Sequence, residues 1–540
     1  MEITRKSFLK GAGIAATATA ALGTTAAASA AEAQNSWEPA KWDYEADIIV
    51  VGFGGSGVVA TIAGIDAGAS VITLEKAPSH EGGNMACSGG QLHEVSDDVD
   101  AWWDMYVAGS YGGNADERTT KAYIGFVNQL PDWFEEHGID VSWKETAGDG
   151  RKTPITYLMG SIEGYEKTTG LYLYTALEKA AMERNADVRT STRAKRLVQN
   201  PFTKEVVGVI AEDANGNELT FKAHKGVILA CGGYENSPEI LYQYFQPGVR
   251  FFPGGTPYNT GDGIRMASEV GAFLWHMGLL EYNRMAYRVP SEIAGFGLTQ
   301  RFSNTNAFIY VNGKGKRFCD ENRSIVHSHP NIEEFGYDDK AYAFPNLPMF
   351  LIFDQTAFEA ENPLWTMNGG YPMARLTANP DASLGIEWPD NNAAVEQGWI
   401  FKGETIEELA AAIKGSSFDG EVDGIDPEAL RETLEAYNAA CEAGEDSAFG
   451  RAANKLEALV NPPFYAIELA NGVMNSNGGP MRNEYAQTLN AFGEVIPRLY
   501  NTGEFGSFNA LVYNFGNLVE SCTTGHVAAE HIASLEAWDM

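Results

Sequence analysis

A short run near the start of the chain has the residue types and spacing of a nucleotide-binding loop. The sequence GFGGSG at residues 52–57 follows an apolar run at residues 46–51, and Glu75 closes the next apolar run. Glycines permit a tight turn and the close approach of a pyrophosphate to a helix N-terminus, and a carboxylate accepts hydrogen bonds from a ribose. The pattern predicts dinucleotide binding; the alternative is a glycine-rich site of helix packing without a ligand.

The elements that would hold this loop follow from the hydrophobic pattern. Residues 46–51 and 69–75 are predicted strands and residues 55–68 a predicted helix, so together they form a βαβ unit. Asn215-Gly216 between two alternating runs predicts a hairpin. The other elements expected in this region are a helix over 171–186, hairpin strands over 206–211 and 218–223, and a buried strand over 225–230.

The middle of the chain has a different character. Residues 273–471 lose the alternation of strands and helices, are rich in aromatic residues, and contain helix starts at Thr405 and at Asp426-Pro427. A strand over 498–502 and a helix over 521–535 then resume the first pattern. We therefore expect a nucleotide-binding domain formed by residues 34–272 and 472–540, interrupted by a capping or substrate domain over residues 273–471.

Residues 1–33 have the organisation of a removable export signal. Arg5 and Lys6 supply charge, residues 11–28 are weakly apolar, and Ala28-Ser29-Ala30 fits a cleavage site. The segment around Arg5 resembles a twin-arginine signal with lysine as the second cation. It predicts an extracytoplasmic protein, in the periplasm or at the cell surface; the alternative is a disordered alanine-rich tail. No later run approaches the roughly 20 apolar residues of a membrane span.

Composition excludes several classes of protein. The chain has 38 Lys+Arg against 72 Asp+Glu, a formal net charge of −34, which disfavours nucleic-acid binding. Five widely spaced cysteines give no disulfide framework, no zinc pair and no haem-attachment motif. His327 and His329 lack a nearby ligand partner at metal-binding spacing, so we expect a loop pair and no metal site.

Further motifs then occur in a fixed order. They are GGN at 82–84, SGG at 88–90, ACGG at 230–233, NTGDG at 259–263, IYVNGKGKRF at 309–318, YNTGE at 500–504 and GNL at 516–518. Together with residues 52–57 they resemble the fumarate reductase and 3-ketosteroid dehydrogenase-type FAD-binding flavoprotein family, in particular a flavocytochrome c-like flavoprotein without a haem domain. The resemblance spans about residues 46–535. It implies an α/β fold in which a Rossmann-like FAD-binding domain is interrupted by an α+β capping domain.

The resemblance also implies the cofactor and its contacts. FAD is expected to be non-covalent, since no histidine occupies residues 82–90, where covalent relatives attach their flavin. The cofactor-binding residues that it predicts are Gly52, Gly54, Gly55, Ser56, Gly57, Glu75, Lys76, Gly83, Asn84, Ser88, Gly89, Gly90, Ala194, Gly232, Gly233, Asp262, Glu504, Asn517 and Leu518.

The catalytic set departs from the fumarate reductase branch. Ile325 stands where that branch has its proton-donating arginine, and Tyr513 replaces an arginine that clamps a carboxylate. Tyr513 instead resembles the tyrosine of the ketosteroid branch, whose phenol polarises a ketone oxygen. Candidates for proton transfer are Tyr282, Arg284 and Arg323. The alternatives are a packed core tyrosine at 513 and salt-bridge roles for the two arginines.

These residues predict an exported FAD-dependent oxidoreductase acting on CH–CH bonds. The expected reaction is reduction of an activated C=C bond, in an enone or enoate that includes steroid-like molecules, by hydride transfer from flavin N5. The expected electron donor is a separate cytochrome or quinol-linked redox protein, because no second nucleotide fingerprint is evident. The alternatives are a 3-ketosteroid dehydrogenase acting oxidatively, a fumarate reductase-like enoate reductase, and a non-catalytic electron-transfer flavoprotein.

Overall fold

The computed structural model describes most of the chain after residue 36. The described residues are 37–539 without 91, 95–99, 101–102, 105–116, 128, 140–141, 147–154, 160–168, 246–250, 288–301, 303, 323–325, 329–335, 365–387, 418–419 and 509–515. The chain divides into two units, Met1–Lys41 and Trp42–Met540, and the fold described below is that of the second. The predicted export signal, Arg323, His329 and Tyr513 lie outside the described residues.

A parallel sheet forms the centre of the nucleotide-binding region. Its strands run in the order β22-β9-β1-β2-β6, all parallel. Their bounds are β1 Tyr44–Val51, β2 Val71–Leu74, β6 Asp187–Arg189, β9 Glu218–Leu229 and β22 Val495–Asn501. Antiparallel strands extend the sheet, with β21 (Gln487–Leu489) beside β22, and β8 (Val206–Glu212) between β9 and β7 (Arg193–Gln199).

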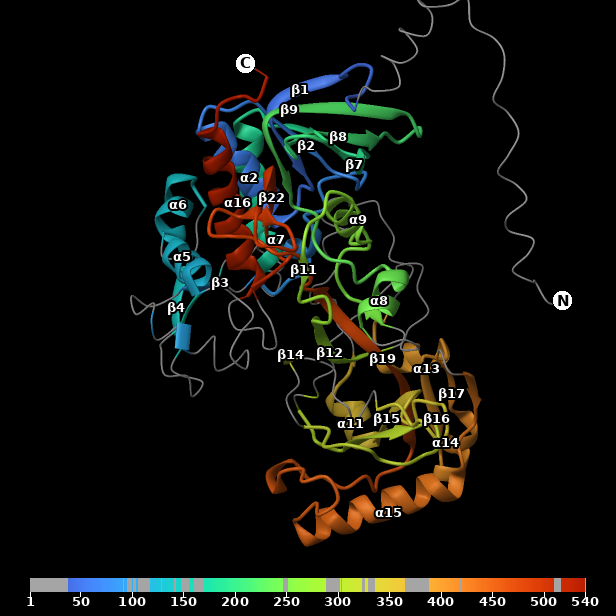
Figure 1. The fold of residues 1–540 in the computed structure, drawn as a ribbon. Helices are drawn as coiled ribbons and strands as arrows, with labels where there is room; N and C mark the ends of the chain where they lie inside the picture. Colours follow the sequence, from blue (N-terminus) through green and yellow to red (C-terminus); the bar gives the residue numbers. More distant parts are fainter. Residues whose placement is uncertain are drawn as a thin grey trace, which may run out of the picture. The chain divides into compact units, whose positions relative to one another are not determined.

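Helices α2 (Gly55–Asp66) and α16 (Asn517–Ala533) pack side by side against one face of this sheet (Figure 1). Small residues allow their close approach, since a Cβ added at Gly525 would lie 2.4 Å from the carbonyl oxygen of Ser56. Alternate residues of β1 serve the two faces: Ile48 and Val50 contact these helices, whereas Ile49 packs on the opposite side. Both faces are therefore covered, as parallel sheets require.

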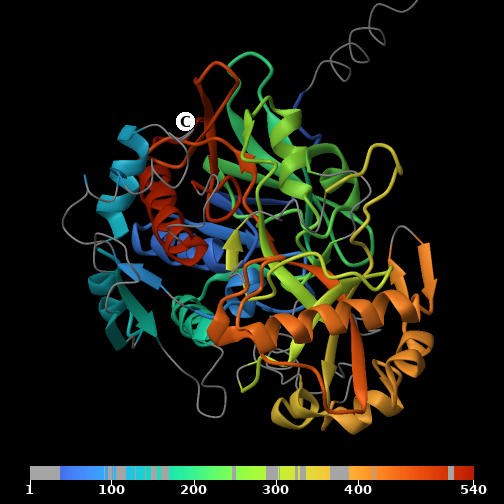
Figure 2. The ribbon, with the colours of Figure 1, turned by 90° about the horizontal axis from the view of Figure 1, so that it is seen from below.

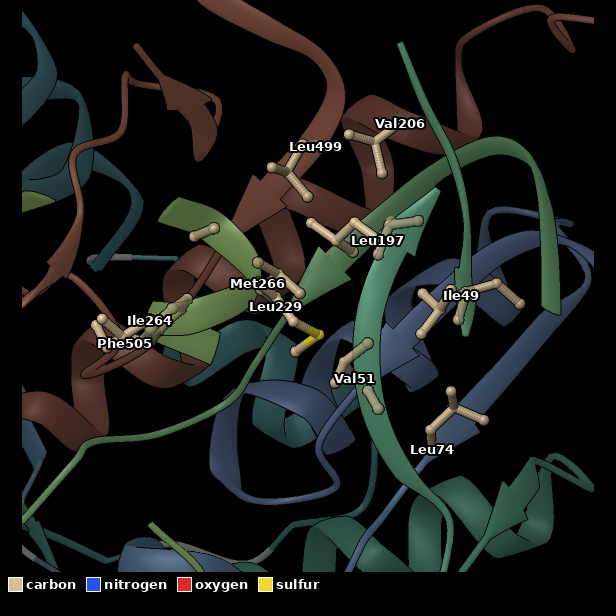
Figure 3. Close-up of a cluster of buried hydrophobic side chains, with 14 of the residues drawn as sticks. Ile49, Val51, Leu74, Leu197, Val206, Leu229, Ile264, Met266, Leu499 and Phe505 are labelled. Atoms are coloured by element: carbon tan, nitrogen blue, oxygen red, sulfur yellow. The ribbon is translucent and has the colours of Figure 1, made fainter. Parts of the chain in front are cut away.

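The opposite face carries the largest core cluster of this region (Figure 3). Ile49, Val51 and Leu229 point into it from the parallel strands, and Leu197 and Val206 join it from β7 and β8. Met266, from α9 (Asp262–Glu269), packs on the same cluster. Burial of these side chains fixes the carboxyl ends of β1, β2 and β9 next to one another, which is where ligands bind in open α/β sheets.

A second sheet is built from strands between Phe252 and Ser476. Its order is β13-β15-β19-β12-β14, with β10 and β16 also paired to β19. The bounds are β10 Phe252–Pro253, β12 Leu280–Tyr287, β13 Phe308–Asn312, β14 Val326–Ser328, β15 Met349–Asp354, β16 Ile400–Gly403 and β19 Phe464–Ser476. The long helix α15 (Pro427–Ala443, orange in Figure 2) packs on this sheet through Leu430, Leu434 and Tyr437.

The remaining elements include α7, with 15 residues, and several shorter helices and strands. The helices are α3 Gly83–Cys87, α5 Glu117–Val127, α6 Leu130–Glu136, α7 Thr169–Glu183, α8 Pro238–Tyr244, α11 Gln355–Ala360, α13 Asn391–Glu396, α14 Ile406–Ala412 and a 3₁₀ turn at Ala453–Lys455. The strands are β3 Leu92–Glu94, β4 Ser142–Thr146, β5 Ile155–Met159, β11 Leu274–Trp275, β17 Lys414–Ser417, β18 Gly420–Asp423 and β20 Gly479–Pro480. Among the described helices, none combines the length and apolar character that crossing a bilayer requires.

The predicted βαβ unit is present as β1, α2 and β2, and the hairpin at Asn215-Gly216 joins β8 to β9. Two expectations were wrong in detail. The strands predicted over 218–223 and 225–230 are one strand, β9, because its first half pairs with β8 and its second half with β22, without a turn between them. The last helix begins at Asn517, after Gly516 at φ +74°, and not at 521.

Candidate functional site

A deep cavity lies at the carboxyl ends of β1, β2 and β9. Its volume is about 1120 Å³, including solvent at its mouth. Fifteen of the predicted cofactor residues line it, namely Gly52, Gly54, Gly55, Ser56, Glu75, Lys76, Gly83, Asn84, Ser88, Ala194, Gly232, Asp262, Glu504, Asn517 and Leu518. The structure thus brings together residues from both ends of the chain into one concave site, as expected of a cofactor-binding site.

The other four predicted residues lie behind or beside the lining. Gly57 faces the backbone of its own loop, and Gly233 lies against the carboxyl groups of Glu235 and Glu504. The amide of Gly90 donates to the hydroxyl of Ser88 at 3.2 Å, and a Cβ added at Gly89 would meet no atom within 4 Å. Gly57 and Gly233 therefore serve packing in this structure, and any cofactor contact of Gly89 and Gly90 stays a prediction.

Two glycines of the first loop are required by close backbone approach. Gly52 has φ +102°, and a Cβ there would lie 2.3 Å from the carbonyl oxygen of Ala230. A Cβ at Gly57 would lie 1.9 Å from the carbonyl oxygen of Gly52. A side chain at Gly52 would push the loop away from Ala230, which follows β9, and one at Gly57 would push the N-terminus of α2 away from Gly52. The loop is therefore shaped to bring backbone amides to the cavity wall.

The N-terminus of α2 is suited to an anion. Its first turn consists of Gly55, Ser56 and Gly57. Gly54 at the N-cap has no side chain that could accept hydrogen bonds from the free backbone amides. Uncapped amides and the positive end of the helix dipole both favour a phosphate. This arrangement fits the pyrophosphate of a dinucleotide.

Glu75 directly follows β2 and is held by two backbone amides. Its Oε2 accepts from the amide of Phe53 at 2.8 Å, and its Oε1 accepts from the amide of Ala77 at 2.7 Å. Each carboxylate oxygen keeps a further lone pair, so a ribose hydroxyl can still donate to it. The contacts orient Glu75 at the cavity, as the ribose interpretation of the motif requires.

The two described cationic side chains of the lining are both engaged by Asp262. Lys76 Nζ lies 2.9 Å from Asp262 Oδ2, and Arg193 donates to both oxygens, at 3.0 Å from Nε and 2.6 Å from Nη2. Burial works to raise the pKa of Asp262, but the hydrogen bonds from Arg193 and Lys76 prevail and lower it to about 2. At neutral pH this group therefore holds two cations and one carboxylate in ion pairs and keeps one net positive charge.

Another part of the lining is formed by the side-chain amides of Asn84 and Asn259 and by Glu504, with Glu235 behind it. Nδ2 of Asn84 donates to Glu235 Oε1 at 2.9 Å and to Glu504 Oε1 at 3.0 Å. Nδ2 of Asn259 donates to the same two oxygens, at 2.8 and 3.0 Å. Burial raises the pKa of both carboxyls, and the pKa of Glu504 is raised well above its usual value by burial and by neighbouring Glu235.

A buried arginine positions the loop that carries Glu504. The side chain of Arg482 donates to the carbonyl oxygens of Asn501, Gly503 and Phe505 and forms an ion pair with Glu520 of α16. Three carbonyls bound to one guanidinium fix the curvature of this loop. The loop is therefore anchored to α16, whose first residues, Asn517 and Leu518, also line the cavity.

The catalytic candidates are placed only in part. Tyr282 and Arg284 belong to β12, where Tyr282 pairs with Val473 of β19. The side chains of both residues, and all of Arg323 and Tyr513, lie outside the described part. Their roles in catalysis stay predictions.

Sequence reasoning missed several lining or supporting residues. Glu235 follows the ACGG motif by two positions, Arg193 precedes predicted Ala194, and Asn259 begins the NTGDG motif. Each lies within three positions of a residue that the resemblance did predict, so the motif positions gave the available signal. Nothing in the spacing could show that Glu235 meets Glu504, which lies about half the chain length away.

Comparison with known proteins identifies the family. Residues 47–513 match the family model described as an FAD binding domain. The chain belongs to this FAD-binding family. The predictions of FAD as the cofactor and of a flavoprotein oxidoreductase are thereby confirmed, and the glycine-lined cavity with its uncapped helix N-terminus fits that cofactor.

Relatives and solved structures agree with this assignment. The digoxin reductase of Eggerthella lenta is 26% identical, over 99% of this chain and 98% of its own length. The structure of 3-ketosteroid Δ1-dehydrogenase from Sterolibacterium denitrificans superposes with a TM-score of 0.70 at 22% identity, covering 91% of this chain and 99% of that one. The open conformation of a flavocytochrome c3 fumarate reductase gives 0.68 at 23% identity, covering 94% and 80%. The fold is that of FAD-binding flavoproteins with mixed helix and strand content.

Proposed function

We propose that this protein is an FAD-dependent reductase of an activated C=C bond in an enone or enoate. The proposed class of substrates includes steroid-like molecules. The observation that carries the proposal is the residue set of the sequence, in which Ile325 and Tyr513 stand where the resemblance to fumarate reductases places two arginines. Binding a dicarboxylate in a desolvated site needs such cations, whereas a neutral carbonyl compound needs only neutral donors. These two positions therefore favour a neutral substrate.

Similarity supports the same reaction class. The relative from Eggerthella lenta, matched over nearly its whole length, is a digoxin reductase. A protein named for reduction of a natural product is a closer guide to this chain than one named for fumarate, given Ile325 and Tyr513 in place of two arginines.

In the proposed mechanism the chain's own residues bind, orient and protonate the substrate. Bound FAD supplies the hydride at its N5 position. The phenol of Tyr513 donates a hydrogen bond to the substrate carbonyl oxygen and stabilises the enolate charge that develops there. Tyr282, Arg284 or Arg323 delivers a proton to the adjacent carbon.

We further propose the architecture and the setting of the reaction. The parallel-sheet region, residues 34–272 and 472–540, is a Rossmann-like FAD-binding domain, and residues 273–471 are a capping domain with α+β structure. FAD is bound without a covalent link. Residues 1–33 direct export, and a separate cytochrome or quinol-linked protein supplies the electrons.

Anaerobic flavin spectroscopy tests the proposed reaction. Photoreduced protein is mixed with enones, enoates and dicarboxylates, and reoxidation of the flavin is followed by absorbance. Rapid reoxidation by a cyclic enone, with slow reoxidation by fumarate, is expected. Preference for fumarate would refute the neutral-substrate argument. Turnover only of saturated ketones with an artificial oxidant would replace the proposal by a ketosteroid dehydrogenase, and reoxidation by none of the compounds would favour an electron-transfer protein.

The export proposal has its own test. The double variant Arg5→Lys with Lys6→Gln should leave the precursor in the cytoplasm, because the arginine read by the export receptor is lost. Cell fractionation of a strain that expresses the variant measures the effect. Normal export would point to another route or to an alanine-rich tail without a signal function.

A further inference from the structure

Glu235 and Glu504 form a buried carboxyl pair beside the FAD cavity. Their exposed fractions are 2% and 8%. The same two amide nitrogens, of Asn84 and Asn259, bind Oε1 of both glutamates. The two carboxyls are thus held together by shared donors, although Glu235 lies near the middle of the chain and Glu504 near its end.

The donors at this pair are neutral. The amide of Thr256 donates to Asn84 Oδ1 at 2.9 Å, which fixes the orientation of that side chain and turns its Nδ2 toward the carboxyls. Each side-chain amide nitrogen has two hydrogens and donates one hydrogen bond to each glutamate, so the donor capacity of both asparagines is used. Among the described residues, no lysine, arginine or histidine forms an ion pair with Glu235 or Glu504.

The charged and titratable groups around the pair do not favour two negative charges. Those that interact electrostatically with one or both of them are Cys87, Tyr234 and Glu520. The cation among the surrounding side chains, Arg482, is used by Glu520 and by three backbone carbonyls. Two adjacent carboxylates in such a site cannot both ionise, and one proton is retained.

The hydrogen bonds distinguish the two glutamates. Glu235 accepts at both oxygens, since Ser476 Oγ donates to its Oε2 at 2.8 Å and is itself bound by the amide of Tyr234. Oε1 of Glu504 accepts hydrogen bonds from both asparagines. Its Oε2 has one side-chain partner, Nδ2 of Asn84 at 3.3 Å. The backbone amide of Gly233 also donates to this carboxyl group. The open position for a proton is therefore Oε2 of Glu504.

We propose that Glu504 is a neutral carboxylic acid at physiological pH, kept so by ionised Glu235, and that its O–H is a hydrogen-bond donor to the bound FAD. Glu504 lines the cavity, whereas Glu235 is behind it. The pair would thus present a donor, not a negative charge, to the cofactor. Since electrons added to a flavin bring negative charge, a neutral donor at this position stabilises the reduced state and an ionised Glu504 would oppose it. In this role Glu504 contacts the cofactor, and Glu235 is a positioning residue that acts through Glu504.

Infrared difference spectroscopy of the FAD-loaded protein tests this assignment. Spectra of wild type at about pH 7 should contain the C=O stretch of a neutral acid that is absent from Glu504→Gln. The matched control is Glu205→Gln. Arg498 binds Glu205, and the pKa of Glu205 is lowered, so this residue does not supply the neutral-acid band. The band should therefore remain in Glu205→Gln. No substrate is present, so the result is independent of the proposed reduction. Absence of the band in wild type, or its presence in Glu504→Gln, would overturn the proposal.

A titration of a second variant keeps the test decisive if Glu504→Gln fails to fold. Removing the charge of Glu235 with Glu235→Gln should retain the band but lower the pH at which it disappears by about 1–2 units. In wild type, the midpoint potential of the flavin should fall steeply with pH above the pH at which the wild-type band disappears. Over the same pH range the fall should be less steep in Glu235→Gln. A band lost in Glu235→Gln at low pH would place the proton on Glu235 and reject the assignment to Glu504.

Discussion

The substitution Gly57→Ala should abolish FAD binding without unfolding the protein. Its new Cβ would lie 1.9 Å from the carbonyl oxygen of Gly52, whereas unstrained carbon–oxygen contacts are about 3.3 Å. The N-terminus of α2 would therefore have to move by about 1.4 Å from the loop. Hydrogen bonds to a charged group contribute about 1.5–3 kcal/mol each, so losing two amide contacts to the pyrophosphate would weaken binding about 100- to 10,000-fold.

Titration of the apoprotein with FAD, followed by flavin fluorescence, measures this effect. The matched control is Gly125→Ala in α5, another helical glycine, where an added Cβ would meet no atom within 4 Å. That variant should bind FAD normally and be slightly more stable, because alanine favours a helix by about 1 kcal/mol over glycine. Affinity of Gly57→Ala within about threefold of wild type, less than 1 kcal/mol, would refute the packing argument.

Three further predictions concern catalysis, acid stability and cofactor attachment. Tyr513→Phe should slow flavin reoxidation by the best substrate by about 30- to 1000-fold, or 2–4 kcal/mol, if the phenol stabilises enolate charge; equal rates with a lower melting temperature would make Tyr513 structural. The pKa of Asp262 is about 2 in the folded protein, against 3.8 when unperturbed. The ionised carboxylate therefore stabilises the folded state by about 2 kcal/mol. This contribution is present above pH 3.8 and is lost as the pH falls toward 2. Denaturant unfolding of Asp262→Asn should therefore show lower stability at neutral pH and a weaker acid dependence, and parallel curves for variant and wild type would contradict this. Heat or acid should release FAD into the supernatant, and flavin that stays with the precipitate would show a covalent link.

Local patterns carried most of what could be predicted from this sequence. Residues 52–57 and Glu75 follow rules of backbone geometry and short spacing, and the structure brings Gly52 and Glu75 to the same cavity. The hairpin at Asn215-Gly216 follows a turn rule in the same way. Long-range pairing is different: which glutamate meets Glu504, or that Arg482 binds the 501–505 loop, depends on the packed chain and leaves no periodic signal. Whether the two predicted strands form one strand, β9, also depends on their pairing partners. The first half of β9 is half-buried and its second half is fully buried, so the two halves have different hydrophobic patterns in the sequence.

The central position of β9 has a consequence for how the protein is made. This strand pairs with β1 near the start of the chain and with β22 near its end, and the cavity lining extends from Val51 to Ser521. A nascent chain can form the first βαβ unit early, but β22 and α16 are synthesised much later. Such non-local pairing is slow to form. Cofactor loading must therefore follow synthesis of α16, and chains that terminate before it would leave the first nucleotide loop without part of the cavity wall.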